Sequence, residues 1–201
     1  IHLFMEQWKY KFSGSGTKQW QLYCYSNRFN RMHKNQKRVD YCALCGNFIY
    51  FKNRLILQAT QKLKQREHLL VIGITGSYGK TTTKEFLAHI LSQKFKVLKT
   101  EVHNNTELAI ANTLLRKLND SHEIFIVEMG AYRRGEIKLL CDMAQPKIGI
   151  LTGISDQHIS LFGSQENIIK GKYELIEALP PKGLAVFNGD NKYCAILYYK
   201  T

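Results

Sequence analysis

One stretch of this sequence reads Val71-Ile-Gly-Ile-Thr-Gly-Ser-Tyr-Gly-Lys-Thr-Thr-Thr83, the pattern of a buried strand that runs through a glycine-rich turn into a helix. Apolar residues fill most of positions 70–74, as they do in a central parallel strand. Gly76 and Gly79 let the backbone turn tightly and aim its N–H groups at one point, where the following helix presents its positive end. The stretch therefore predicts a phosphate-binding loop.

The Gly-Lys-Thr triplet that starts at position 79 is the strong form of such a loop. Lys80 then reaches the β- and γ-phosphates of a nucleoside triphosphate, and the Thr81 hydroxyl holds Mg²⁺. The position five before Gly79 is Ile74 and not the usual glycine, so the alternative is a glycine-rich turn before an ordinary helix. We predict that the chain binds ATP and Mg²⁺. The predicted nucleotide contacts are Thr75, Gly76, Ser77, Gly79, Lys80, Thr81 and Thr82.

Composition favours a soluble, cytoplasmic protein. The chain has 201 residues, of which 44% are hydrophobic, and it contains no run of 18 apolar residues. It begins at Ile1 without a signal-peptide pattern, so we expect a piece of something longer. Five scattered cysteines argue against a disulfide framework and for a reducing compartment. The alternative is a zinc knuckle that combines Cys42 and Cys45 with Cys24 and His33.

Most of the net charge of +13 lies before residue 70. Aromatic residues are interleaved with the basic residues of this segment, a composition that suits nucleic acid or an anionic membrane surface. The simpler interpretation is a solvated, irregular leader at 1–52. We expect this interpretation to hold, with no nucleic-acid partner.

Helical and strand patterns alternate after residue 50, and they predict an α/β fold. A helix at 51–67 is expected to lead in. Strands are then expected at 68–75, 97–100, 123–128, 148–154 and 184–188, and helices at 81–94, 107–118, 135–144, 164–179 and from about 190. This alternation predicts a parallel sheet with helices on both faces and a ligand site at the carboxyl ends of its strands. The expected domains are the leader at 1–52, a helical lead-in at 53–70 and an ATP-binding domain at 71–201.

The sequence also predicts the apolar faces of two of these helices. The face of the helix at 81–94 is expected to consist of Phe86, Leu87, Ile90 and Leu91. In the helix at 164–179, Lys172 falls on the same stripe as Ile168, Leu175 and Leu179. An uncompensated ammonium is costly on an apolar face, so Lys172 is expected to pair, to snorkel or to be chemically changed.

Polar residues gather where the predicted strands end. Glu128 closes an apolar strand at a position where P-loop proteins commonly place a Mg²⁺-holding carboxylate, and a strand-end Glu in water is the alternative. His158 follows the next strand, although a lone His is more often a packed or surface residue. Both belong at the edge of the sheet where the ligand site is expected.

Four ordered motifs together resemble the central ATPase domain of the Mur ligases. They are Thr75-Gly-Ser-Tyr-Gly-Lys-Thr-Thr-Thr-Lys-Glu85, Val127-Glu-Met-Gly130, His158 with Phe162-Gly-Ser164, and Gly171-Lys-Tyr-Glu174. The resemblance covers about residues 53–201 and implies the fold of that domain in incomplete form.

The resemblance also implies roles for individual residues. Lys80 and the loop amides would hold the ATP phosphates, Thr81 and Glu128 would serve one Mg²⁺, and His158 a second. Lys172 matches the position that is carbamoylated in Mur ligases, which would make it a further metal ligand. Asn105 and Thr106 fall in a substrate-side loop, where His103 and Ala109 depart from the family pattern.

The implied activity is ATP-dependent amide-bond formation in peptidoglycan precursor synthesis, with Lys80, Glu128, His158 and Lys172 as the catalytic set. The Thr-Thr-Thr-Lys-Glu run and Gly135-Glu-Ile137 favour the branch that joins a UDP-MurNAc-tripeptide to D-alanyl-D-alanine. Residues 1–50 do not resemble the UDP-sugar-binding domain of the family, and we expect the amine-binding domain to be absent. We therefore expect a monomeric fragment without ligase activity of its own.

Three alternatives remain open at this point. One is another Mur-type ligase, or an enzyme like folylpolyglutamate synthetase. Another is a non-ligase P-loop ATPase that binds nucleic acid through its basic leader. The third is a remnant that binds nucleotide without catalysis.

Overall fold

The computed structural model describes residues 37–102, 104–156 and 159–201. The chain divides into two compact units, Ile1–Phe51 and Lys52–Thr201. Helix α3 (Lys37–Lys64) begins well before the predicted helix at 51–67, so the prediction of an irregular segment is wrong for residues 37–50. The stretch contains no proline and a single glycine, and helix propagation does not require an amphipathic period. The rest of the predicted leader lies outside the described residues.

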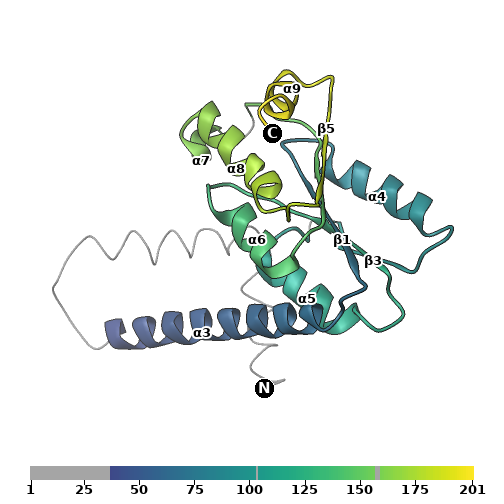
Figure 1. Cartoon of the computed structure of the whole chain (residues 1–201). Helices are drawn as coiled ribbons and strands as arrows, with labels where there is room; N and C mark the ends of the chain where they lie inside the picture. Colours follow the sequence, from purple (N-terminus) through teal and green to yellow (C-terminus); the bar gives the residue numbers. More distant parts are fainter. Residues whose placement is uncertain (1–36, 103, 157–158) are drawn as a thin grey trace. The chain divides into compact units, whose positions relative to one another are not determined.

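A parallel sheet forms the centre of the second unit, as the sequence predicts (Figure 1). Its strand order is β2-β3-β1-β4-β5. The strands are β1 (Leu70–Thr75), β2 (Val97–Lys99), β3 (Ile124–Glu128), β4 (Ile148–Leu151) and β5 (Leu184–Phe187). All four pairings are parallel, with Ile74 opposite Glu128 on one side of β1 and opposite Ile150 on the other. The carboxyl ends of the strands therefore share one edge.

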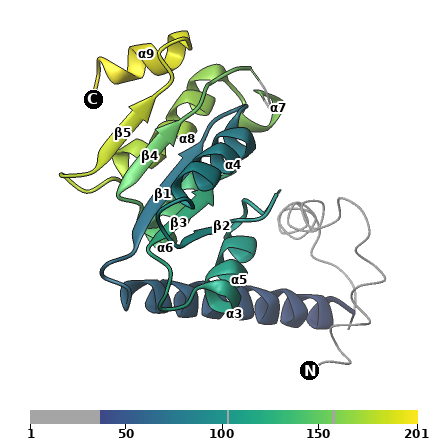
Figure 2. The same cartoon turned by 90° about the vertical axis from the view of Figure 1, so that its right-hand side faces the viewer.

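Helices cover both faces of this sheet, with α4 on one face and α5, α6 and α8 on the other (Figure 2). The helices that follow α3 are α4 (Lys80–Leu91), α5 (Glu107–Lys117), α6 (Glu136–Ala144), α7 (Ile159–Phe162), α8 (Gln165–Glu177) and α9 (Lys192–Tyr198). The short α7 was not predicted. None of the helices in the described ranges is long and apolar enough to cross a bilayer.

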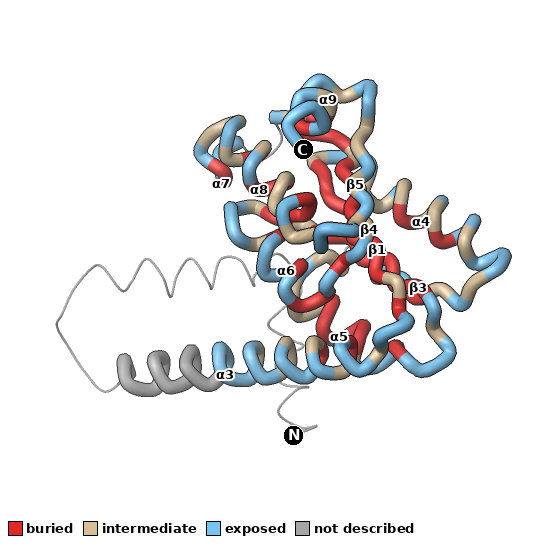
Figure 3. Tube along the Cα trace, in the orientation of Figure 1, coloured by how far each residue is buried: buried red, intermediate tan, exposed pale blue. Residues whose placement is uncertain are grey.

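Alternate side chains of the central strands supply two separate cores, because successive residues of a strand point to opposite faces. Val71, Phe125 and Val127 belong to the larger core beneath α5, α6 and α8. Ile72 and Ile126 belong to the smaller core beneath α4. Figure 3 shows the buried positions running along the central strands and the helices that pack on them, so the carboxyl edge of the sheet is supported from both faces.

The predicted apolar face of α4 is only half right. Leu87 and Leu91 pack against the smaller core, but Phe86 is 67% exposed and Ile90 is 64% exposed. The stripe that faces the sheet instead includes Lys84, whose side chain is completely buried. Lys84 can be buried at this position because it forms an ion pair with the buried Glu128.

Candidate phosphate-binding and metal site

The loop between β1 and α4 has the shape that the sequence predicts for a phosphate cradle. Gly76 has φ 153°, and a Cβ atom there would lie 2.2 Å from the Thr152 hydroxyl oxygen, so only glycine fits. Gly79 begins α4 in the left-handed region with φ 76°. No side chain caps the first N–H groups of α4, and these groups carry the positive end of the helix dipole. This geometry favours an anion in front of the loop.

Residues of the segment that follows β4 hold the loop in place. The Ser77 N–H donates to the Gly153 carbonyl over 2.7 Å, and the Ser77 hydroxyl accepts from the Ser155 N–H over 3.1 Å. The Thr152 hydroxyl donates to the Tyr78 carbonyl. Ser77 therefore ties the loop to the neighbouring strand, and its predicted contact with nucleotide stays a prediction.

Lys80 lies across the mouth of the loop. Its Nζ donates to the Gly76 carbonyl over 2.9 Å, which folds the side chain back over the turn. Burial lowers the pKa of Lys80 from its usual range, and the nearby charge of Glu128 partly opposes this shift. A phosphate oxygen offers this ammonium a stronger partner than a neutral carbonyl does.

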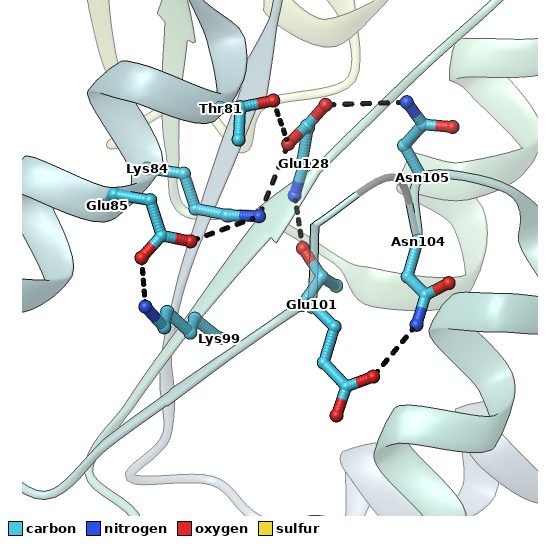
Figure 4. A network of polar contacts seen from close by, with 9 residues as sticks. Thr81, Lys84, Glu85, Lys99, Glu101, Asn104, Asn105 and Glu128 are labelled. Carbon is cyan, nitrogen blue, oxygen red and sulfur yellow. Dashed lines mark hydrogen bonds and ion pairs between the residues drawn. The ribbon is translucent and has the colours of Figure 1, made fainter.

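Glu128 is the centre of a polar network at the carboxyl end of β3 (Figure 4). Its side chain is almost fully buried, with 2% of the residue exposed. Oε2 accepts from the Thr81 hydroxyl over 2.9 Å and from Lys84 Nζ over 3.3 Å, while Oε1 accepts from Asn105 Nδ2 over 3.3 Å. Two segments distant in sequence, α4 and the segment before α5, therefore converge on this carboxylate, which rules out the alternative of a strand-end Glu in water.

Lys84 is the residue of this network that our sequence reasoning missed. It forms an ion pair with Glu128, and its Nζ also lies 3.5 Å from a carboxylate oxygen of Glu85, which pairs in turn with Lys99. A signal was available, because Lys84 shares its helical stripe with Ala88 and Leu91. The argument that singled out Lys172 applies to Lys84 equally.

Lys172 lies where the sequence predicts, buried on the inner stripe of α8 with 4% of the residue exposed. Its Nζ donates to the Ala131 carbonyl over 3.4 Å and lies 5.6 Å from the centre of the Phe162 ring. Burial, and then the charge of Lys80, lower its pKa from 10.5 to about 8, although Glu136 and Glu174 oppose the shift. Lys172 is thus neither snorkelling nor paired with a carboxylate.

The glycine-rich loop, the segment around Asn105 and Lys172 line the same pocket. It is lined by Gly76, Ser77, Lys80, Asn105, Gly130, Ala131, Tyr132 and Lys172. Tyr132 is a second residue that sequence reasoning missed, and no pattern marks it beyond its place four residues after β3. The sequence-predicted residues of the loop, of β3 and of α8 therefore meet at the carboxyl edge of the sheet.

Other predicted site residues have separate placements. Asn105 lies at the network, where its backbone carbonyl accepts from the Gly130 N–H over 3.1 Å, and Thr106 is the exposed residue that precedes α5. Thr82 is exposed on the first turn of α4. His158 and His103 lie outside the described residues, so their predicted roles stay predictions.

The structure describes the side chains of two of the five cysteines. Cys141 and Cys194 are free and buried, and burial raises the pKa of Cys141 to about 12. The side chains of Cys24, Cys42, Cys45 and His33 lie outside the part of the chain that the structure describes. The zinc alternative therefore stays untested.

Thr75 makes a structural contact, and its predicted contact with nucleotide stays a prediction. Its buried hydroxyl donates to the Met129 carbonyl over 3.0 Å and so joins the ends of β1 and β3. We expect Thr75→Val to lower the free energy of unfolding by about 1–3 kcal/mol, since it leaves a buried carbonyl without that donor. ATP affinity, measured by calorimetry, should stay within about twofold of wild type, because the hydroxyl donates within the protein. A twofold change in affinity corresponds to well below 1 kcal/mol of binding free energy. A large loss of affinity in a stable variant would instead support the predicted contact of Thr75 with nucleotide.

A parallel sheet whose first strand runs through this glycine-rich loop into a helix defines a P-loop-type α/β nucleotide-binding domain. Residues 74–201 match the family model of the Mur ligase middle domain. The chain belongs to the Mur ligase family, which confirms the resemblance seen in the sequence.

Individual relatives agree with this assignment. The chain is 45% identical over 128 residues to the UDP-N-acetylmuramoyl-tripeptide–D-alanyl-D-alanine ligase of Synechocystis, covering 64% of this chain and 28% of the relative. A crystal structure of MurF from Acinetobacter baumannii superposes with a TM-score of 0.69 at 31% identity, covering 74% of this chain and 32% of that one. MurF from Thermotoga maritima in complex with ADP gives a TM-score of 0.66 at 36% identity, with 69% and 32% covered. The chain thus spans about a third or less of these relatives.

Proposed function

We propose that this chain is the ATP-binding part of a ligase that joins a UDP-MurNAc-tripeptide to D-alanyl-D-alanine in peptidoglycan synthesis. The observation that carries the proposal is the pocket in which the P-loop Lys80 and the buried Lys172 meet beside Glu128. The names of the relatives support the choice of substrates, and the ADP complex of the Thermotoga protein supports ATP as the nucleotide. We further propose a cytoplasmic monomer that has no nucleic-acid partner.

The donor set beside the loop fits Mg²⁺. Thr81, Glu128 and Asn105 offer hydroxyl, carboxylate and amide oxygens, which are the hard ligands that this ion prefers. We assign Thr81 and Glu128 to one ion, and His158 and a modified Lys172 to a second. When bound, the metal would neutralise charge on the phosphates.

The chain's own residues contribute binding and orientation. The free N–H groups at the start of α4 receive the phosphates, and Lys80 exchanges the Gly76 carbonyl for a phosphate oxygen. A carboxylate oxygen of the tripeptide attacks the γ-phosphorus, which gives an acyl phosphate and releases ADP. The amine of D-alanyl-D-alanine then attacks the acyl carbon, forms the amide and expels inorganic phosphate. Lys80 contributes to catalysis by stabilising the negative charge where the substrate carboxylate approaches the γ-phosphate.

A chimera tests this function. Residues 74–201 of this chain replace the matched segment of the Synechocystis relative, which supplies the rest of the ligase. We expect ATP-dependent formation of the UDP-MurNAc-pentapeptide, detected by mass spectrometry, and no stimulation of ATP hydrolysis by DNA or RNA. The matched control is the same chimera with Lys80→Ala, which should be inactive. A folded chimera that binds ATP but makes no pentapeptide would contradict the proposed substrates.

A further inference from the structure

We propose that Lys84 is a built-in counter-ion that competes with free Mg²⁺ for Glu128, so that the site takes up the metal only together with nucleotide phosphates. This inference rests on the proposed function, because it concerns the same metal and nucleotide. It assigns Lys84 as a positioning residue that acts through Glu128 and touches no substrate.

The position of Lys84 suits this role. Its ammonium lies 3.3 Å from Glu128 Oε2, the oxygen that also accepts from Thr81. None of the Lys84 side chain is exposed, so water cannot take over as its partner. Any cation that approaches Oε2 from the Thr81 side therefore meets a fixed positive charge behind the same oxygen.

The charge balance of the pocket points the same way. Lys80 and, before any modification, Lys172 bring positive charge to its lining, while Glu128 is hydrogen-bonded to Asn105 of the lining and to Lys84. Across the described ranges, no group of three or more His, Cys, Asp or Glu side chains is placed to hold a metal ion. Affinity for a hard divalent cation rises with the number of charged ligands. The described residues alone therefore offer free Mg²⁺ a poor site.

The remaining acidic groups near Lys172 are already occupied. Glu174 accepts from the N–H groups of Gly135 and Lys138. Glu136 accepts from the N–H groups of Tyr132 and Arg133. Both carboxylates thus serve backbone donors around the start of α6, so neither adds a free charge at Thr81 and Glu128. The phosphates of ATP would supply further negative charge for the metal at this site.

Manganese binding by the 201-residue chain tests the inference, because electron paramagnetic resonance counts free Mn²⁺ without any need for activity. Wild type should bind Mn²⁺ weakly alone, and with ATP it should remove clearly more free Mn²⁺ than the same concentration of ATP removes without protein. Lys84→Met keeps the length of the side chain but removes its charge, and it should raise the affinity for Mn²⁺ without nucleotide by about tenfold or more. Lys84→Arg keeps the charge and should behave as wild type. Lys182→Met, which removes an exposed charge before β5 at the opposite edge of the sheet, controls for net charge.

The possible outcomes separate the inference from the proposed function. Unchanged or weaker Mn²⁺ binding by folded Lys84→Met without nucleotide would overturn the inference and make Lys84 a core ion pair. If Lys84→Met fails to fold by circular dichroism, Lys84→Gln replaces it, since its amide still donates to Glu128 without charge. Wild type that binds no Mn²⁺ with ATP would instead overturn the proposed metal site.

Discussion

Replacing Lys172 by alanine in the chimera is expected to lower the rate of ligation by about a hundredfold or more. The side chain lies in the pocket beside Lys80 with 4% of the residue exposed, and its ammonium faces the Ala131 carbonyl without a carboxylate partner. Removal of one charge-stabilising group from a water-excluded site typically costs about 10²–10³ in turnover. Lys172→Arg, which keeps a positive charge but forms no carbamate, should fail to rescue the rate.

The same burial prepares Lys172 for carbamoylation. Carbon dioxide reacts with a neutral amine, forms the new N–C bond and releases one proton, so the reaction requires the deprotonated lysine. With a pKa of about 8, the amine is mostly protonated below pH 8 and mostly neutral above it. The product carries carboxylate-like oxygens, which suit a hard cation, and it removes an unpaired buried ammonium.

This chemistry gives a readout that does not depend on activity. In ¹³C-bicarbonate, wild-type chain should show a carbamate resonance that is absent from Lys172→Ala and Lys172→Arg. The resonance should fall as the pH drops from 9 to about 6, because protonation removes the reacting amine. Full activity of Lys172→Ala in the chimera, or no carbamate at pH 9, would contradict the assignment.

The sequence was enough to predict most of the sheet and its ligand edge. Short apolar runs bounded by turns indicate the parallel strands, and the glycine spacing indicates the loop, because both signals are local. Glu128 and Lys172 were also predictable, because each breaks the pattern of the element that carries it. The structure then brings the loop, β3 and α8 together, as the rule for parallel sheets requires.

What the sequence reasoning missed depends on contacts between distant segments. Lys84 is buried because Glu128, on another element, compensates its charge, and hydrophobicity alone placed Phe86 and Ile90 wrongly on the inner face of α4. Asn105 was expected at the substrate, but its amide also holds Glu128. The start of α3 was missed for a different reason, because that stretch has no regular apolar period to detect.

Removal of the Lys80 side chain is expected to weaken ATP binding by the 201-residue chain by about 10–100-fold. Lys80 is the cation that folds over the loop, with Nζ 2.9 Å from the Gly76 carbonyl. A charge-assisted contact to phosphate is worth about 1.5–3 kcal/mol, which corresponds to that range of affinity. Calorimetry with Mg²⁺ and ATP on Lys80→Ala measures the effect directly.

The size of this loss should depend on which phosphates the nucleotide carries. Because the motif directs the lysine to the β- and γ-phosphates, Lys80→Ala should weaken AMP binding far less than ATP binding. Lys182→Met removes an exposed charge far from the loop and should leave ATP affinity unchanged, which separates a specific contact from the general attraction of a basic chain for an anion. Equal ATP affinities in wild type and Lys80→Ala would remove the phosphate-binding assignment, and with it the reason to place a metal at Thr81 and Glu128.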